Sequence, residues 1–380
     1  MLVDGVDYQI NIIILLMENE IDVTIQTVET LLESVEDGVV ISVLLNGGSN
    51  LELKKLLSTV DCIRYYESPT NLGVAGGRNF LLKTAECKGS DIVMILDNDV
   101  VPPVDYVRNL ATFLIRQKEA GVVGAIVADV NTSITYSTVR HFGDRGRFDN
   151  KIFRITSKEI KQYLSANLTS WCLFHIGIDP DFKFAYFSAC LHSCRIVNPL
   201  LALFRISERS NPVLKWNAKY LKLILSGADK YVVSNVAGCS QAFRRKLVDE
   251  IGYLNDMFNP YGFEDVDFCI RSTKAGYKNY IDTNTWLYHG TDTRHKGKNP
   301  NKALENQFRC LTILASGTVY DLLRYKLVIL KTIIFSFLFD LLIRPHQAFK
   351  RVKAKVGGFK TGVKIVEDNA RKTQELHISC

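Results

Sequence analysis

Residues 92–99 read IVMILDND, and this stretch decides the fold class. Its first five residues are an apolar run that ends at polar residues, which predicts a buried strand of a parallel sheet. Ligands of open α/β sheets bind beyond the carboxyl ends of such strands, where Asp97 and Asp99 stand. Carboxylates at i and i+2 project to the same side of an extended chain, so the pair predicts a site for a divalent cation. Solvated turns often carry the same short pattern, so the prediction needs support from other segments.

A glycine-rich segment, NLGVAGGRN, lies just upstream of this strand and is followed by a helical pattern. Gly73 and Gly76 let the backbone approach a ligand closely, and the free amide groups of a helix N-terminus attract phosphate. Arg78 adds a forked cation. We therefore predict that Asn71, Gly73, Gly76, Arg78 and Asp97 contact a nucleoside diphosphate. The alternative is a plain glycine turn that caps a helix; the spacing also differs from the Gly-x-Gly-x-x-Gly of dinucleotide folds, which argues against a dehydrogenase.

Three acidic residues mark the second half of the chain. The stretch YGFEDVDF places Glu264, Asp265 and Asp267 among aromatic residues, and the stretch TWLYHG brings His289 to the end of a predicted strand. A positioned carboxylate can accept a proton in catalysis. Acids at this position also cap helices, here one predicted over residues 268–274, and a histidine at a strand end often has a structural role.

These motifs, in this order, resemble those of the family 2 glycosyltransferases, inverting enzymes of the GT-A fold that use nucleotide-activated sugars. The resemblance covers residues 8–295 and includes an apolar first strand at 10–16 and a second strand at 39–45. It implies an α/β fold, with a Rossmann-like mixed sheet that binds a nucleotide sugar and is flanked by helices. Within the family, the chain looks like the bacterial enzymes that build surface polysaccharides.

The resemblance also implies a mechanism, a single displacement at the anomeric carbon. Mn²⁺ or Mg²⁺ held by Asp97, Asp99 and His289 would neutralise the leaving nucleoside diphosphate. Asp265 would be the general base that takes the proton of the acceptor hydroxyl, and Glu264 would bind the acceptor. Asp267 would be a supporting residue or a helix cap. The partners implied are a nucleotide-diphosphate sugar and a glycan or lipid-linked acceptor.

One position departs from the family pattern. Family members usually carry an acidic residue after the second strand, in a turn that contacts the nucleotide base, whereas residues 44–50 read LLNGGSN. Asn46 can still donate and accept hydrogen bonds, so we keep it as a predicted nucleotide contact. The base itself stays open.

Composition places the chain among cytoplasmic α/β proteins. Its 380 residues suffice for one α/β domain with additions. We expect the glycosyltransferase domain over residues 1–310, with a helical insertion on the acceptor side at about 130–233, and a C-terminal extension over residues 311–380. Nine cysteines without a Cys-x-x-Cys pair fit a reducing compartment, and the start of the chain has no basic segment of the kind a secretory signal needs.

The C-terminal extension predicts contact with a membrane. Apolar residues recur at three- and four-residue spacing from Leu323 to Leu341, and residues 344–364 carry cations without a single acid. The pattern favours an amphipathic helix and a basic tail at an anionic membrane surface, peripheral on the inner face of the cell membrane. The alternative is a helix packed on the catalytic domain with a loose tail.

Two other classes of function are weaker. A sugar nucleotidyltransferase shares a similar nucleotide fold, but its glycine-rich signature is missing from residues 12–19. A non-catalytic module that binds membrane or nucleic acid through the basic end leaves the acidic motifs unexplained, so no nucleic-acid partner is expected.

Overall fold

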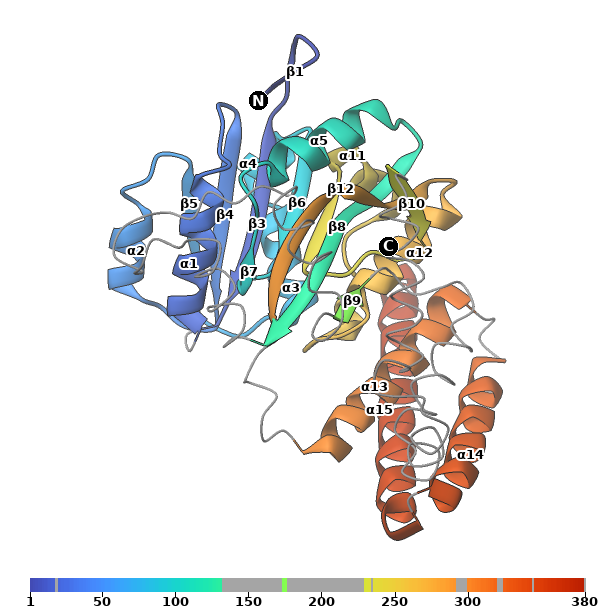
Figure 1. Ribbon diagram of the computed structural model, residues 1–380. Coiled ribbons are helices and arrows are strands. Elements are labelled where there is room, and N and C mark those ends of the chain that lie inside the picture. Colours follow the sequence, from blue (N-terminus) through green and yellow to red (C-terminus); the bar gives the residue numbers. More distant parts are fainter. Residues whose placement is uncertain are drawn as a thin grey trace, which may run out of the picture.

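The computed structural model describes residues 1–17, 20–131, 173–175, 229–233, 235–291, 299–319, 324–343 and 345–378. These residues form an α/β part and a helical part that extends from it (Figure 1). Most of the insertion expected at about 130–233 lies outside the described residues.

The α/β part is built on one mixed sheet with the strand order β10-β12-β8-β11-β6-β3-β4-β5. Its parallel half consists of β3 (Ile10–Leu16), β4 (Val39–Asn46), β5 (Ile63–Ser68) and β6 (Ile92–Leu96). Its other half consists of β8 (Ala120–Asn131), β10 (Lys230–Val233), β11 (Ser240–Arg244) and β12 (Lys278–Thr291), and β11 runs antiparallel to both β6 and β8. Two short strands lie off this path: β7 (Val100–Val101) pairs with β12, and β9 (Leu173–His175) pairs with β8. The strands β1 (Leu2–Val3) and β2 (Val6–Asp7) form a separate hairpin. The expected mixed α/β sheet is confirmed.

Helices cover both faces of this sheet because its central strands are apolar on both sides. Successive side chains of a strand point to opposite faces, and in β6 Met94 and Val93 accordingly enter two different core clusters. The first cluster packs against α1 (Ile21–Leu32), α2 (Leu51–Leu57) and α5 (Tyr106–Arg116). The second packs against α3 (Gly73–Leu82), α11 (Arg245–Ile251) and α12 (Glu264–Lys274), and the single turn α4 (Ala85–Lys88) follows α3.

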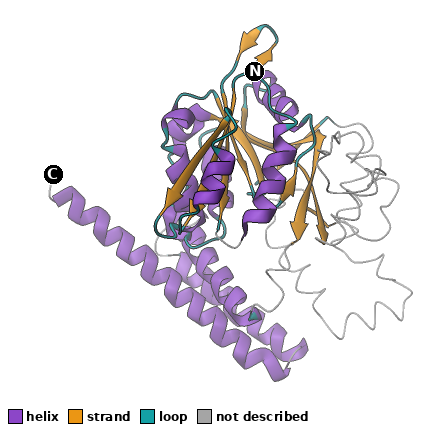
Figure 2. Cartoon of the chain, turned by 90° about the vertical axis from the view of Figure 1, so that its left-hand side faces the viewer, coloured by secondary structure: helices purple, strands orange, loops and turns teal. Residues whose placement is uncertain are grey.

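The helical part consists of α13 (Pro300–Leu314), a π-helical turn (Ala315–Val319), α14 (Tyr325–Ile343) and α15 (Pro345–Ile378). Figure 2 shows the long last helix running past the α/β part to the C-terminus. The boundary expected after residue 310 falls inside α13, and the stretch expected as a basic tail forms α15 instead. Among the helices that the structure describes, none has the length and apolarity needed to cross a bilayer.

Close packing joins α15 to α13. A Cβ atom added at Gly358 would lie 2.0 Å from the carbonyl oxygen of Glu305, and one added at Gly362 would lie 2.7 Å from Cβ of Thr312. The backbones of the two helices therefore approach so closely that only glycine fits at these positions. Phe308 and Leu311 of α13 complete this interface as part of a third core cluster. The C-terminal helices are thus packed onto the rest of the chain.

Candidate active site

The carboxyl ends of the central strands form the site. β6 ends at Leu96 and is followed at once by Asp97, Asn98 and Asp99, as the sequence predicts. The chain then turns into β7, where Val100 pairs with His289 of β12. Thr27 of α1 fixes this turn, because its hydroxyl lies 2.8 Å from the carbonyl oxygens of both Asn98 and Val100.

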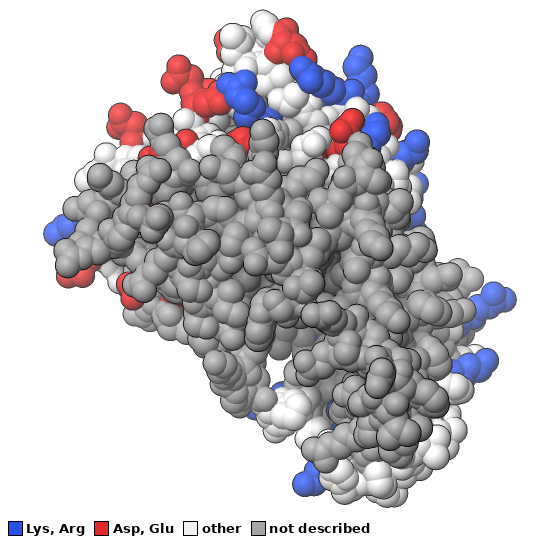
Figure 3. Space-filling model, in the orientation of Figure 1, with Lys and Arg blue, Asp and Glu red and all other residues white. Residues whose placement is uncertain are grey.

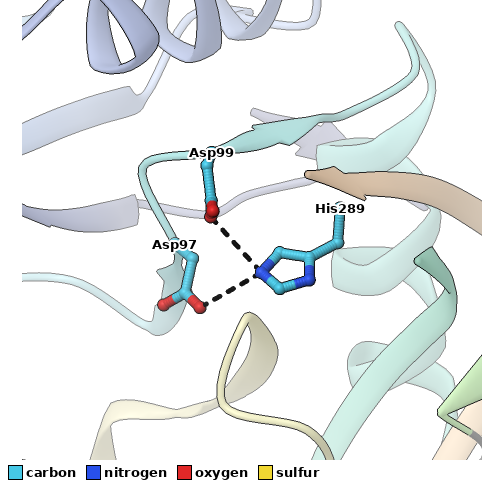
Figure 4. A group of neighbouring side chains, drawn as sticks. All are labelled: Asp97, Asp99 and His289. Atoms are coloured by element: carbon cyan, nitrogen blue, oxygen red, sulfur yellow. Dashed lines mark ion pairs between the residues drawn. The ribbon is translucent and has the colours of Figure 1, made fainter. Parts of the chain in front are cut away.

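Asp97, Asp99 and His289 lie together and point toward one another (Figure 4). Nε2 of His289 is 3.3 Å from Oδ1 of Asp99 and 3.7 Å from Oδ2 of Asp97, and one ligand atom from each residue lies within 4.8 Å of the others. Two hard carboxylate oxygens and one imidazole nitrogen suit Mn²⁺ and leave coordination positions for phosphate oxygens. The three residues predicted as metal ligands are therefore brought together, and their chemistry fits a divalent cation.

Arg78 of α3 connects this cluster to a second pair of acids. Its Nη2 donates to Oδ1 of Asp97 at 2.7 Å and to the carbonyl oxygen of Gly238 at 3.1 Å, while Nη1 donates to Oε1 of Glu264 at 3.0 Å. Burial alone would lower the pKa of Arg78, but the charges of Asp97 and Glu264 raise it above its ordinary value. Arg78 is predicted to bind phosphate, but in the structure both of its terminal nitrogens donate to protein oxygens.

Glu264 and Asp265 open helix α12, where the helix dipole favours negative charge. Gly262 donates its backbone N–H to Oε2 of Glu264 at 2.9 Å. Asp265 accepts backbone N–H groups from Gly238 at 2.9 Å and from Val266 at 2.9 Å. Burial, together with the charge of Glu264, raises the pKa of Asp265 to about 7, against the opposing charge of Arg78. A carboxyl group with this pKa can exchange protons near neutral pH.

Asp267 has a structural role in these contacts. Its Oδ2 accepts from Nε of Arg271 at 2.8 Å, one helical turn further along α12. Arg271 also donates to the carbonyl oxygen of Tyr253 at 2.9 Å. Asp267 therefore helps to fix α12 to the preceding segment. This is the supporting role that the sequence predicts for Asp267.

Asn46 is enclosed by the glycine-rich segment. Its side-chain N–H₂ donates to Oδ1 of Asn71 at 3.2 Å and to the carbonyl oxygen of Gly73 at 3.1 Å, and its Oδ1 accepts from the backbone of Leu72 at 2.8 Å. Only 1% of Asn46 is exposed. Gly73 has φ +75°, and an added Cβ atom would lie 2.4 Å from Oδ1 of Asn259. Asn46 and Asn71 therefore shape the start of α3.

Sequence reasoning missed the loop of residues 255–263, which joins the glycine-rich segment, the acids and the C-terminal helices. Asn259 accepts from the backbone N–H of Gly76 at 3.3 Å, and Pro260 accepts from that of Val74 at 2.8 Å. Arg309 of α13 holds the loop from the other side. No motif marks these contacts in the sequence, because they join residues far apart along the chain.

The guanidinium group of Arg309 donates to four carbonyl oxygens of this loop. The acceptors and distances are Asn259 at 2.7 Å, Phe258 at 2.9 Å, Tyr261 at 3.1 Å and Met257 at 3.2 Å. Arg309 is 6% exposed, so these bonds replace its hydration. The only sequence signal is a cation at a position where α13 faces the core.

Comparisons with known proteins agree with this geometry. The model of the family described as Glycosyl transferase family 2 matches residues 12–177. Among solved structures, a crystal structure of GalNAc-T7 with UDP, GalNAc and Mn²⁺ superposes with a TM-score of 0.50 at 11% identity, and the match covers 83% of this chain and 49% of that one. The chain thus spans about half the length of that protein. A search of curated proteins found no match.

A second structure is the mannosyltransferase PcManGT from Pyrobaculum calidifontis in complex with GDP-Man and Mn²⁺. Its TM-score is 0.47 at 11% identity, with 94% of this chain and 88% of that chain covered.

The mixed sheet and the structural match define a chain of the GT-A fold. Residues 12–177 match the model of glycosyl transferase family 2, in agreement with the resemblance of the motifs in this part of the chain. The family match ends at residue 177, before Glu264, Asp265 and His289. The roles of these three residues are therefore proposed below from their geometry.

Proposed function

We propose that the protein is an inverting glycosyltransferase that moves a sugar from a nucleoside diphosphate sugar to a hydroxyl group of a glycan or lipid-linked acceptor. The observation that carries the proposal is the bridge made by Arg78. One guanidinium group contacts Asp97 of the metal cluster and Glu264 of the acidic pair, so both sets of acids belong to one site.

Asp97, Asp99 and His289 would hold Mn²⁺ or Mg²⁺, which supplies Lewis-acid stabilisation of the leaving diphosphate. Asp99 is the stronger candidate ligand, because Arg78 already occupies one oxygen of Asp97. The backbone N–H groups of Val74 and Gly76 donate to Pro260 and Asn259, so α3 would act on the diphosphate through its helix dipole rather than through free amide groups. Asn46 and Asn71 would act on the nucleotide by fixing the backbone of Gly73 at the start of α3.

Asp265 would be the general base. The acceptor oxygen forms a bond to the anomeric carbon, the bond from that carbon to the diphosphate oxygen breaks, and the electron pair leaves with the diphosphate. The proton of the acceptor hydroxyl passes to the carboxylate of Asp265, whose pKa of about 7 suits this transfer. Glu264 would bind an acceptor hydroxyl through Oε2, which accepts the backbone N–H of Gly262 and keeps a second lone pair for a further donor.

We further propose that the acceptor is presented at the cytoplasmic face of an anionic membrane, in the assembly of a bacterial surface polysaccharide. The support is the exposed apolar side of α14 and the cations of α15. A transferase acting on a lipid-linked acceptor has to work at such a surface.

The proposed function is tested by determining the anomeric configuration of the product. The full chain is incubated with Mn²⁺, a panel of nucleoside diphosphate sugars and lipid-linked or soluble glycan acceptors, and the new linkage is read by proton NMR. We expect a nucleoside diphosphate and a glycoside of inverted anomeric configuration. Retained configuration would contradict the mechanism. Formation of pyrophosphate from a nucleoside triphosphate and a sugar 1-phosphate would instead establish a sugar nucleotidyltransferase.

A further inference from the structure

Helix α14 is apolar on two sides: Tyr325, Ile329 and Ile333 are buried in the third core cluster, and a second row of apolar side chains points outward, opposite two buried polar residues. Ser336 and Asp340 are 8% and 6% exposed, whereas Ile334 and Leu338 are 53% and 54% exposed. The sequence predicts one apolar stripe for this helix, and the structure places most of that stripe on the surface rather than against the protein. A helix that is apolar all round is normally buried on every side, in protein or in a membrane, so the exposed row calls for a partner.

The inward polar residues are satisfied by α15. Nε of Arg351 donates to Oδ1 of Asp340 at 2.9 Å, and the ammonium group of Lys355 contacts both Asp340 and Ser336. Lys355 is 1% exposed. The buried charges are therefore paired within the hairpin, which can keep its two helices together in surroundings of low dielectric constant.

The outward apolar residues form one continuous surface, which we call the α14 face. Its residues recur at three- or four-residue spacing on α14, and the ring of Phe349 on α15 extends them because it packs 5.5 Å from that of Phe337. They are Leu327, Leu330, Ile334, Leu338, Leu342 and Phe349. From 327 to 342 the face runs about 22 Å along the helix. An exposed apolar patch of this kind marks a contact with a membrane or another molecule.

Cations accompany the α14 face. Lys331 is exposed within it, and Lys353, Lys360 and Lys364 follow Phe349 along one side of α15. Glu367 continues that side but pairs with Lys326 of α14 at 2.8 Å. Figure 3 shows blue side chains along the outer edge of the helical part, without red among the coloured atoms there. The surroundings of the apolar face are thus positively charged.

We propose that the α14 face docks on an anionic lipid bilayer. The apolar side chains would enter the boundary between headgroups and acyl chains, and the lysines would reach the headgroup phosphates with their apolar stems along the membrane surface. A second copy of the chain or another protein fits less well, because lysine is depleted at the centre of protein interfaces. The inference deepens the membrane part of the proposed function and does not depend on the transferase chemistry.

The first test changes the apolar contact. Ile334→Glu places a charge on the α14 face without touching the packed side of the hairpin. Leu56→Glu is the matched control, because Leu56 of α2 is 51% exposed but lies far from α14. The full chain is sedimented with phosphatidylcholine vesicles that contain or lack phosphatidylglycerol. We expect Ile334→Glu to lower the partition coefficient on the anionic vesicles about tenfold to a hundredfold, and the control to bind as wild type.

The second test changes the charge. The double variant Lys353→Glu/Lys360→Glu should weaken binding to the anionic vesicles, and salt should do the same, whereas Lys54→Glu/Lys55→Glu on α2 should not. Equal binding of wild type and Ile334→Glu would overturn the proposal. So would a wild-type dimer that Ile334→Glu converts to a monomer with no loss of vesicle binding, which would identify a second copy as the occupant.

Vesicle binding and transfer are read separately. Release of nucleoside diphosphate with a soluble acceptor measures the transferase, and Ile334→Glu should leave it unchanged. If wild type binds vesicles but shows no transfer with any donor, the proposed function fails and the docking face stands. If transfer is found without vesicle binding, the docking face fails alone.

Discussion

At the scale of single residues, the site is organised by one arginine. Arg78 contacts Asp97, Glu264 and the carbonyl oxygen of Gly238, so it fixes the distance between the metal cluster and the acidic pair. Burial is the largest cause of the raised pKa of Asp265. The charge of Glu264 raises this pKa further, and the charge of Arg78 lowers it. The proposed base thus depends on charges that also order the metal ligands.

Asp265→Asn tests the base. The amide keeps the shape of the side chain but cannot accept a proton, so we expect turnover to fall about 10²- to 10⁴-fold while nucleotide affinity stays near wild type. For wild type, kcat/KM should rise as pH rises through about 7, because the carboxylate is the active form. A normal rate for Asp265→Asn, with a loss in Glu264→Gln instead, would move the base to Glu264.

Arg78→Lys tests the bridge. A single ammonium group cannot reproduce the fork, and at least one buried carboxylate loses a charge-assisted hydrogen bond. We expect turnover to fall by at least about tenfold, the amount of one such bond, and nucleotide binding in Mn²⁺ to weaken. Arg64→Lys is the control, because Arg64 is exposed on β5. Wild-type turnover in Arg78→Lys would show that the bridge is dispensable.

The sequence predicts which residues form much of the site, but it does not predict the hydrogen bonds that connect them. Asp97, Asp99 and His289 meet as expected, because strand ends of one sheet share an edge. The contacts of Arg78 and the enclosure of Asn46 could not be predicted from spacing. Arg78 contacts Gly238 and Glu264, which lie 160 and 186 residues further along the chain, and Asn46 contacts a turn that lies 25 to 27 residues away.

At the scale of elements, the C-terminal helices support the loop that carries the acids. Arg309 of α13 holds residues 257–261, and α15 holds α13 through Gly358 and Gly362. The strands at 10–16 and 39–45 could be predicted because a short apolar run bounded by polar residues is typical of a buried strand. The helix α15 could not, because its paired glycines and its lack of acids between 344 and 364 suggest a loose tail. Its stability comes from packing against α13, which a local pattern does not reveal.

The glycine pair of α15 tests this packing. Gly358→Ala places a methyl group 2.0 Å from the backbone oxygen of Glu305, so we expect a loss of stability of about 1–3 kcal/mol. At Gly357 the added Cβ atom meets only Oε1 of the flexible Glu305 side chain at 3.0 Å. Gly357→Ala should therefore gain about 0.5–1 kcal/mol from helix propensity. The melting temperatures of the two variants, measured by thermal unfolding, test this prediction. Equal melting temperatures would contradict the close contact.

At the scale of the whole molecule, the helical part packs against the α/β part next to the proposed site. The packing of α15 on α13 and on the loop below α12 means that the last helices are not a detachable anchor. The docking face proposed for α14 would therefore join the membrane to the same structure that carries the acids.

Truncation before Asp321 shows whether this unit is continuous. Removing α14 and α15 exposes Phe308 and Leu311, which are buried in the full chain. We expect the shortened protein to aggregate, or to lose most of its nucleoside diphosphate release, together with its vesicle binding. A well-folded truncated chain with wild-type turnover would show that the helical part serves the membrane alone.

We propose that Asp97, Asp99 and His289 hold the cation that serves a nucleotide-sugar transferase. The most direct measurement is release of nucleoside diphosphate by the full chain across a panel of donors, with Mn²⁺ and with chelator, for wild type, Asp99→Ala and the exposed control Asp61→Ala. We predict release by wild type and by the control in Mn²⁺ only, and none by Asp99→Ala, since the cluster then keeps a single carboxylate, Asp97, one oxygen of which is held by Arg78. Unchanged release in the presence of chelator, or by Asp99→Ala, would contradict the account.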